Sequence, residues 1–222
     1  MGIKSVMNTD RLFWLGRYSE RVYTTLKLFS SSFDTLIEQR EDDHRVFCES
    51  LEIPDIYRDK DDFIARYPFG LDDPNSIISN LYRAYDNAIE LREEIGSETL
   101  SFIQMAIYEM KSAMRSEAPL LHFQKITDAI LAFWGCADDQ IDDENTRNII
   151  KIGKRVERID LYARLRRDRA VIRREIRRLS WRIRRTELIY SEAGLQRLQE
   201  LADAPELDYL EIIRIVDTLV EC

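Results

Sequence analysis

The chain contains one short pattern twice, as Gly-Arg-Tyr-Ser-Glu-Arg-Val over residues 16–22 and as Gly-Lys-Arg-Val-Glu-Arg-Ile over residues 153–159. Each copy reads glycine, a base, two further residues, Glu-Arg and a β-branched aliphatic residue. The same offset of 137 residues also pairs apolar residues ahead of the pattern, for example Leu12 with Ile149. We therefore predict an internal duplication that places an acid and a base at equivalent positions on two helices.

Composition and spacing predict an all-α fold. The chain has 222 residues, 45% of them hydrophobic, but only 7 Gly and 5 Pro, which favours long helices over strands joined by frequent turns. Between residues 12 and 36 the apolar side chains recur at steps of three and four, which predicts a helix from a cap at residues 8–10 to about Arg40. Later segments carry similar stripes, and we expect helices to end at Gly96 and Gly135.

These helices are expected to form an internally duplicated helical bundle with long helices. We predict a single domain over residues 1–222, with a first repeat over about residues 8–118 and a shortened second repeat over about residues 119–222. In such a bundle the two repeat helices would pack against each other about a pseudo-twofold axis. A twofold sets each acid against the other copy's base, which predicts Glu20 beside Arg158 and Glu157 beside Arg21.

Charge and cysteine content limit the function classes. A formal charge of −8 and a pI near 5.0 argue against generalised binding to nucleic acid or to an anionic membrane. No apolar run approaches the ~20 residues that span a bilayer, and residues 1–10 lack the apolar core of a signal peptide. Cys48, Cys136 and Cys222 are widely spaced, which fits reduced thiols. We expect a cytoplasmic protein without a membrane partner.

The Glu-Arg pairs admit two interpretations. Apolar side chains surround Glu20 and Arg21 on several faces of their helix, so both charges are expected to be at least partly buried. Buried charges need partners or shifted pKa values. One interpretation is a buried acid–base network that ties two helices together. The other is a polar site in which Glu20 and Glu157 act as acid, base or ligand. Gly16, one turn before Glu20, would let another backbone approach closely.

We predict no metal site and no cofactor. The Asp-rich stretch over residues 138–143 resembles the Mg²⁺ motif of all-helical isoprenoid synthases, but a facing second motif is missing beyond the weak pair Asp72-Asp73. Capping of the next helix by Asp142 or Asp143 explains it better. Glu41 and His44 have the Glu-x-x-His spacing of di-iron bundles, but only one copy exists.

An arginine-rich segment spans residues 164–185 and holds eleven arginines and two acids. It therefore carries +9, which leaves −17 on the rest of the chain. Its apolar residues keep helical spacing, so we predict a helix. One interpretation docks this helix on the protein's own acidic surface, such as the glutamates between residues 90 and 98. The other gives it an anionic ligand, a partner protein or, least favoured, nucleic acid.

The two Glu-Arg patterns make the chain resemble the bacterial alpha-E family, which is named for predicted helices with a Glu-Arg motif. The resemblance rests on residues 13–21, on residues 152–165 and on a central segment that runs from Asn75 through Arg83 to Arg92. Residues 169–222 lack the second central helix of the longer family members. The resemblance implies association with ATP-grasp ligases and transglutaminase-like proteins in a bacterial peptide synthesis or tagging system.

The leading hypothesis is a non-catalytic or accessory helical protein that binds a peptide or a partner ligase; a homodimer is a further assembly that the sequence allows. The competing hypothesis is an enzyme of amide or peptide chemistry, and a Mg²⁺-dependent isoprenoid enzyme ranks third. The candidate binding residues come from the two motifs and the central helix: Arg17, Glu20, Arg21, Arg83, Glu157 and Arg158.

Overall fold

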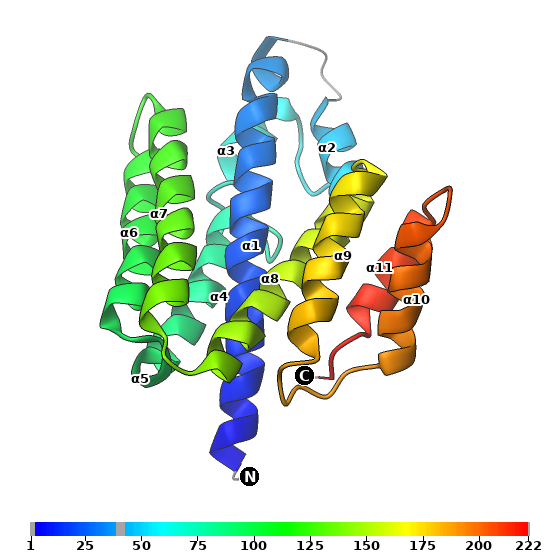
Figure 1. The fold of residues 1–222 in the computed structure, drawn as a ribbon. Coiled ribbons are helices and arrows are strands. Elements are labelled where there is room, and N and C mark those ends of the chain that lie inside the picture. The colour runs from blue at the N-terminus through cyan, green and yellow to red at the C-terminus, as the bar shows by residue number, and fades with distance from the viewer. Residues whose placement is uncertain (1–2, 39–42, 222) are drawn as a thin grey trace. The chain divides into compact units, whose positions relative to one another are not determined.

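The computed structural model describes residues 3–38 and 43–221 (Figure 1). These residues form helices α1 (Ile3–Glu38), α2 (Asp43–Leu51), α3 (Lys60–Arg66), α4 (Ile77–Glu90), α5 (Arg92–Ile95), α6 (Ser97–Ala113), α7 (Pro119–Gln140), α8 (Glu144–Arg164), α9 (Arg169–Ile183), α10 (Glu192–Asp203) and α11 (Tyr209–Asp217). Within these ranges the only strand-like pairing is a single antiparallel bridge between Tyr190 and Val220. The predicted all-α fold is confirmed.

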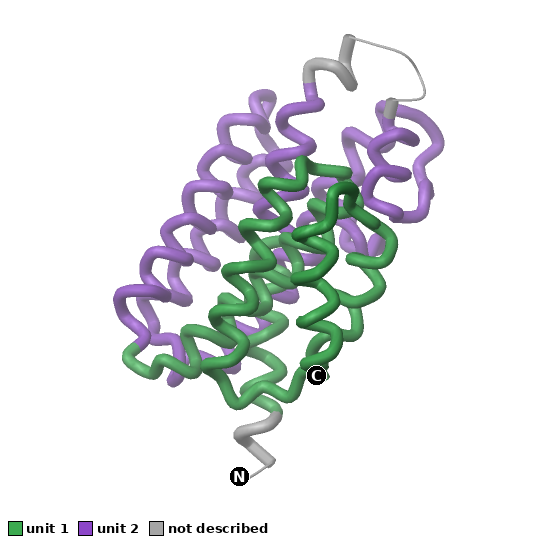
Figure 2. The backbone as a smooth tube through the Cα atoms, turned by 45° about the vertical axis from the view of Figure 1, so that its right-hand side comes forward, with its two compact units in different colours: residues 1–20, 142–222 green, residues 21–141 purple. Residues whose placement is uncertain are grey.

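The chain divides into two compact units that share α1 (Figure 2). Unit 1 comprises residues 1–20 and 142–222, and unit 2 comprises residues 21–141. These borders differ from the repeat border expected near residue 118, because unit 1 combines the start of α1 with α8 to α11. The single domain and the duplication of the whole chain stay predictions.

Unit 2 is held together by an aromatic cluster. Phe29 of α1 lies with its ring centroid 5.9 Å from that of Phe63 of α3 and 5.9 Å from that of Phe123 of α7. Phe47 of α2 lies 5.2 Å from Phe63. Aromatic pairs at these separations add to the stabilisation that burial alone supplies. The predicted short helices between residues 41 and 74 are thus α2 and α3, anchored by one aromatic side chain each.

Polar residues ahead of α4 have structural roles. Asp73 is buried and accepts hydrogen bonds from the hydroxyl of Tyr57 at 2.6 Å and from the backbone of Asn75 at 2.8 Å. Burial, together with that bond to Asp73, raises the pKa of Tyr57. Asp72 instead pairs with Arg66 at 3.0 Å, and Ser76 caps α4 through the backbone of Ser79. The pair Asp72-Asp73 therefore shapes a turn and a helix start.

The two described cysteines, Cys48 and Cys136, are free thiols, as expected, and Cys222 lies outside the described residues. Burial raises the pKa of Cys48 to about 12, so its thiol stays protonated at neutral pH. A protonated, buried thiol is a poor nucleophile, and Cys48 is best understood as part of the apolar core of unit 2.

Two helix boundaries differ from the prediction. α1 begins at Ile3, so residues 8–10 lie inside the helix and do not cap it; residues 3–7 contain no glycine or proline that would stop it. α7 continues through Gly135 to Gln140. Gly135 is exposed and a side chain there would touch nothing within 4 Å, while Phe133, Trp134 and Ala137 around it are buried. Packing of those neighbours outweighs the weak helix propensity of one glycine.

α8 begins as predicted, at an aspartate cap. Asp143 is the N-cap residue of α8 and accepts a hydrogen bond from the backbone of Thr146 at 2.6 Å. The hydrogen bonds from Thr146 lower the pKa of Asp143 below its usual value. Asp139 lies on the last turn of α7, where its carboxylate accepts from the neighbouring Gln140 side chain at 2.7 Å. Helix termination thus divides the Asp-rich stretch between two elements.

We expect Asp143→Ala to lower the free energy of unfolding by about 1 kcal/mol at pH 7, because one backbone N–H of α8 loses its acceptor. Asp143→Asn should retain the cap, and Asp139→Ala should change little. Since the folded-state pKa of Asp143 is depressed, its contribution is present above the ordinary carboxyl pKa and is lost as pH falls through the folded value. Urea unfolding at pH 7 and pH 3 measures both effects. Equal losses for Asp143→Ala and Asp139→Ala would contradict the assignment.

Unit 1 packs α9 between its neighbours through the predicted apolar stripe. Ile172, Ile176, Leu179 and Ile183 are all fully buried. α9 packs against α8 and α10, and α11 packs against α8 and α10. The prediction of a helix in the arginine-rich segment is confirmed, with α8 ending at Arg164 and α9 beginning at Arg169. Among the helices described, none combines the length and apolar character that crossing a lipid bilayer requires.

Candidate functional site

The two Glu-Arg patterns meet where the first half of α1 crosses α8 in unit 1. A methyl group placed on Gly16 would lie 2.0 Å from the carbonyl oxygen of Ile150. A methyl group on Gly153 would lie 2.0 Å from the carbonyl oxygen of Phe13. The two backbones therefore touch at both glycines, as the sequence predicted for Gly16. Direct packing of the two pattern-bearing helices is confirmed.

The contact is reciprocal. Gly16 and Phe13 occupy the positions that Gly153 and Ile150 occupy in the second copy, and each glycine faces the other copy's carbonyl. A twofold relation between α8 and the first half of α1 produces such an exchange. This local symmetry supports the predicted duplication at these two helices.

Glu20 forms the central ion pair of the site. Its carboxylate accepts from Arg158 through two hydrogen bonds, Nε to Oε1 at 2.6 Å and Nη2 to Oε2 at 2.8 Å. The Glu20 side chain is 0% exposed and that of Arg158 is 15% exposed. Burial acts to lower the pKa of Arg158, but the charge and hydrogen bonds of Glu20 outweigh it and raise that pKa. The predicted pairing of Glu20 with Arg158 is confirmed, in the bidentate geometry that arginine and carboxylate favour.

Glu157 also forms an ion pair with a basic residue of α1, Arg17. Its carboxylate accepts from Nε of Arg17 at 2.7 Å, and its side chain is 2% exposed. Arg17 also lies over the indole of Trp14, with its Cζ 4.9 Å from the ring centroid, and Trp14 stacks on Tyr18. The sequence placed Arg17 among the binding residues without foreseeing this pair. The repeated pattern does contain a signal for this pair, because a basic residue directly follows the glycine in each copy.

Two predicted site residues belong to unit 2. Arg21 is the first residue of that unit, and its pairing with Glu157 stays a prediction. Arg83 lies on α4 and donates through Nη1 to the carbonyl of Pro74 at 2.8 Å, which ties α4 to the turn that precedes it.

The sequence interpretation missed Lys154, the counterpart of Arg17 in the second copy. Burial lowers the pKa of Lys154 to about 7, and the nearby charges of Arg158, Arg155 and Lys151 act in the same direction. The carboxylate of Glu20 acts against them but does not restore the ordinary value. Lys154 therefore loses its proton far more readily than an ordinary lysine, and it lies close enough to Glu20 to sense the charge of that carboxylate.

We expect the free energy of unfolding to rise with pH between pH 7 and 9.5. The folded-state pKa of Lys154 lies below its unfolded value, so in this window the unfolded chain holds a proton that the native chain has released. The slope per group is at most about 1.4 kcal/mol per pH unit. Lys151, whose pKa burial lowers to about 8, adds to the slope at the upper end.

Urea unfolding across that pH range tests this expectation. Lys154→Met should flatten the slope and Lys151→Met should flatten only its upper part. Lys125→Met is the matched control, because its amine is half exposed and pairs with Glu109 at 3.6 Å. A pH slope that Lys154→Met leaves intact would show that Lys154 keeps its ordinary protonation in the native state.

Two further buried acids extend the ion-pair network along α8. Asp160 accepts from Nε of Arg164 at 2.9 Å and 3.1 Å, and burial raises the pKa of its carboxyl. Glu175 of α9 is 1% exposed and accepts from Arg155, and from Arg178 at 3.1 Å. The sequence interpretation counted Glu175 only as a charge in the arginine-rich segment. Its place on the apolar stripe, three residues after Ile172 and one before Ile176, signalled burial.

The arginine-rich segment docks partly within its own unit. Arg164 lies 3.9 Å from Asp217, Arg173 lies 2.5 Å from Asp203 and Arg184 lies 3.1 Å from Glu192. These pairs support docking in cis, on α10 and α11 of the same unit. The suggested docking on the glutamates between residues 90 and 98, which belong to unit 2, stays a prediction. The second interpretation, an anionic ligand, is taken up below.

Both histidines belong to unit 2. His122 of α7 pairs with Glu109 of α6 at 2.7 Å, and His44 is buried near Asp55 at 3.7 Å. Glu41 lies outside the described residues. Within the described ranges no group of three or more His, Cys, Asp and Glu side chains could hold a metal ion. The expected absence of a metal and of a cofactor stays a prediction.

One family model matches the chain. The model of the Alpha-E family, described as a predicted alpha-helical domain with a conserved ER motif, matches residues 8–198. That range contains both Glu-Arg pairs, the contact between α1 and α8 and all of α9. Comparison with curated proteins finds no match, and neither does comparison with solved structures.

Proposed function

Because the chain belongs to the Alpha-E family, we propose that it is a non-catalytic, accessory helical protein that binds a partner ligase or its peptide. The resemblance of its motifs points to a partner from the ATP-grasp ligases or the transglutaminase-like proteins, in a bacterial, cytoplasmic peptide synthesis or tagging system. The observation that carries the proposal is the burial of the Glu-Arg acids. Glu20 and Glu157 are 0% and 1% exposed, and arginines hold their carboxylates.

Closed ion pairs suit a structural role. A carboxylate that is to act as acid, base or ligand must be reached by a substrate, and these two are covered. Breaking a buried pair to free one carboxylate would cost several kcal/mol. The burial of these ion pairs therefore supports the interpretation that they form a structural network between α1 and α8. A partner protein would then bind elsewhere, on the exposed surface of the molecule.

Unit 2 offers apolar surface of the kind that partner proteins cover. Met105 and Tyr108 stand one turn apart on α6 and are 53% and 69% exposed. Leu121 and Leu131 of α7 are 61% and 48% exposed. Exposed aromatic and methionine side chains are enriched at protein interfaces. We propose that the partner ligase binds on the α6–α7 hairpin, and that a bound peptide would reach the complex through the ligase.

Co-expression with a bacterial ATP-grasp ligase tests the proposal. Size-exclusion chromatography with light scattering should give a complex of defined mass. Tyr108→Glu should abolish it, because a charge would be buried in the apolar interface. Leu210→Glu is the matched control, since Leu210 is 55% exposed on α11 of unit 1. Absence of a complex, or equal loss with both variants, would contradict the proposal.

Lys154 favours one second candidate, an enzyme of amide or peptide chemistry. A neutral buried amine can act as a nucleophile or a general base near pH 7, and lysines activated by burial do so in enzymes. Under this candidate the isolated chain would turn over an activated acyl substrate. Lys154→Met would abolish turnover while the chain still folds, whereas Lys151→Met would leave turnover in place. Lack of turnover by the isolated chain favours the accessory role.

A further inference from the structure

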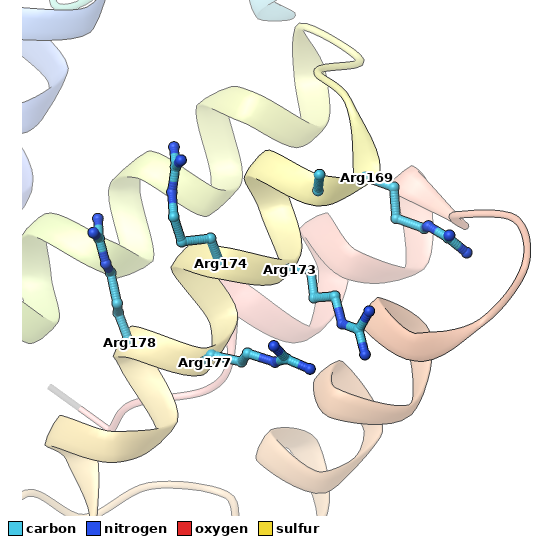
Figure 3. A pocket seen from close by; sticks show the side chains of 6 residues that line it. Arg169, Arg173, Arg174, Arg177 and Arg178 are labelled. Carbon is cyan, nitrogen blue, oxygen red and sulfur yellow. The ribbon is translucent and has the colours of Figure 1, made fainter.

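The outer face of α9 forms a groove lined almost entirely by arginine (Figure 3). Its lining residues fall into two rows at i, i+4 spacing: Arg169, Arg173 and Arg177 in one, and Ala170, Arg174 and Arg178 in the other. Arg173 and Arg177 project to one side of the helix, while Arg174 and Arg178 project to the other. The cavity measures about 420 Å³, within the size of small-ligand sites.

The positive charge in the groove is only partly neutralised. Arg174 and Arg178 share the carboxylate of Glu175, which Arg155 also binds. Arg173 pairs with Asp203, and Arg169 donates to the carbonyls of Ala204 and Pro205. The lining arginines together with Arg155 therefore meet two carboxylates, Glu175 and Asp203. Most of their charge has no acid to balance it.

Two donors in the groove lack acceptors. Arg177 makes no hydrogen bond or ion pair with any residue in the described ranges, and it is exposed. The Nε atom of Arg173 is buried and has no hydrogen-bond partner there. Buried polar atoms are nearly always hydrogen-bonded in native proteins, so an unpartnered donor beside a cavity marks a place for a ligand acceptor.

The N-terminus of α9 adds to the positive electrostatic potential of the groove. The groove begins at Arg169 and Ala170, the first two residues of the helix, and the first turn contains no acidic side chain. The positive end of the helix macrodipole and the backbone N–H groups of Arg169 and Ala170 favour an anion at this end. The N–H groups of Val171 and Ile172 donate instead to the carbonyl of Asp168.

We propose that the groove along α9 binds a small polyphosphate anion. The guanidinium groups of Arg174, Arg177 and Arg178 would donate paired hydrogen bonds to its phosphoryl oxygens. The planar guanidinium group matches phosphate through paired hydrogen bonds. From residue 169 to residue 178 the groove runs about 13 Å along the helix, long enough for a chain of several phosphates. The proposal stands independently of the partner proposed for unit 2.

The surroundings favour a small anion over a macromolecule. A protein interface has an apolar centre from which charges are depleted, and here Ala170 is the only lining residue that is not arginine. Single-stranded nucleic acid needs aromatic platforms for its bases. The nearest exposed aromatic residue on α9 is Trp181, and its ring is covered by Arg185, with Cζ 3.9 Å from the centroid.

Isothermal titration calorimetry with the full chain and sodium tripolyphosphate, at 50 mM and 200 mM salt, tests the proposal. Binding should be saturable, one to one, and weaker at the higher salt. Arg177→Gln should weaken it about tenfold and Arg174→Gln with Arg177→Gln about a hundredfold, since each lost fork is worth roughly a factor of ten. Arg177→Lys should lie between Arg177→Gln and the parent, because it keeps the charge and loses the fork.

The controls separate this site from general charge attraction. Arg197→Gln removes an exposed arginine of α10 outside the groove and should leave the affinity unchanged. ATP that binds as tightly as tripolyphosphate would show recognition of the phosphates alone, and tighter binding of ATP would identify a nucleotide; both support the proposal. Absence of tripolyphosphate binding at 50 mM salt, or equal loss with Arg197→Gln, overturns it. A single-stranded oligonucleotide or a polyglutamate peptide that binds more tightly than tripolyphosphate also overturns it.

Discussion

Replacing Arg158 with alanine is expected to lower the free energy of unfolding by about 3–5 kcal/mol, the range for a buried ion that loses its partner. Glu20 is fully buried and accepts two hydrogen bonds from this one side chain. After the substitution the carboxylate keeps its desolvation cost without its main compensation. Urea unfolding followed by circular dichroism at pH 8 measures the loss.

An exposed pair of the same geometry provides the control. Arg197 donates to Glu211 through Nε at 2.7 Å and through Nη2 at 3.0 Å, which matches the bidentate bond between Arg158 and Glu20. Its side chain is 50% exposed, so water replaces the lost contacts and Arg197→Ala should cost far less than Arg158→Ala. Similar losses for Arg158→Ala and Arg197→Ala would mean that burial does not decide the strength of the pair.

The double variant Arg158→Met, Glu20→Leu separates the cost of an orphaned charge from the value of the pair. Apolar side chains of similar size often replace a buried ion pair without loss of stability. We therefore expect the double variant to be more stable than Arg158→Ala. A double variant as unstable as the single one would show that the ion pair itself contributes a large net stabilisation.

Gly16→Ala is expected to cost about 3 kcal/mol or more, with a similar loss for Gly153→Ala. At each position the new methyl group would lie 2.0 Å from a backbone carbonyl oxygen of the facing helix. A backbone atom cannot rotate away as a flexible side chain can, so α1 and α8 must separate, and their ion pairs lengthen. Losses from overpacking usually reach 1–3 kcal/mol, and displacement of whole helices exceeds the usual case.

Gly135→Ala is the matched control for both glycines. Gly135 also lies inside a helix, but a side chain there would meet nothing within 4 Å. The higher helix propensity of alanine should make this variant more stable by up to about 1 kcal/mol. Thermal unfolding of the three variants gives the comparison. A stabilising or neutral effect of Gly16→Ala would contradict the close backbone approach.

The sequence predicted part of the Glu-Arg site. The repeated pattern paired Glu20 with Arg158 correctly, because a twofold relation sets each acid against the other copy's base. It did not foresee that Arg17 would hold Glu157, or that burial would lower the pKa of Lys154 to about 7. Both depend on how closely the helices approach, which the number and spacing of residues do not reveal.

The end of α7 shows a different limit. Glycine was expected to stop the helix at Gly135, but the buried Phe133, Trp134 and Ala137 carry it on to Gln140. Local propensity is worth about 1 kcal/mol at one position, while a buried aromatic side chain is worth more. Packing partners therefore decide where a helix ends when the local signal is a single residue.

The sequence by itself determined the all-α class, the buried stripe of α9 and the packing of the two pattern-bearing helices against each other. Helical periodicity, scarce glycine and a repeated pattern can all be read directly from the order of residues. They do not depend on which helices pack together. Only the tertiary structure decided that Arg17 binds Glu157, which arginines of α9 are neutralised in their own unit and which ones line an open groove. Those outcomes depend on distances between residues far apart in the chain, because Coulomb attraction and burial act through space.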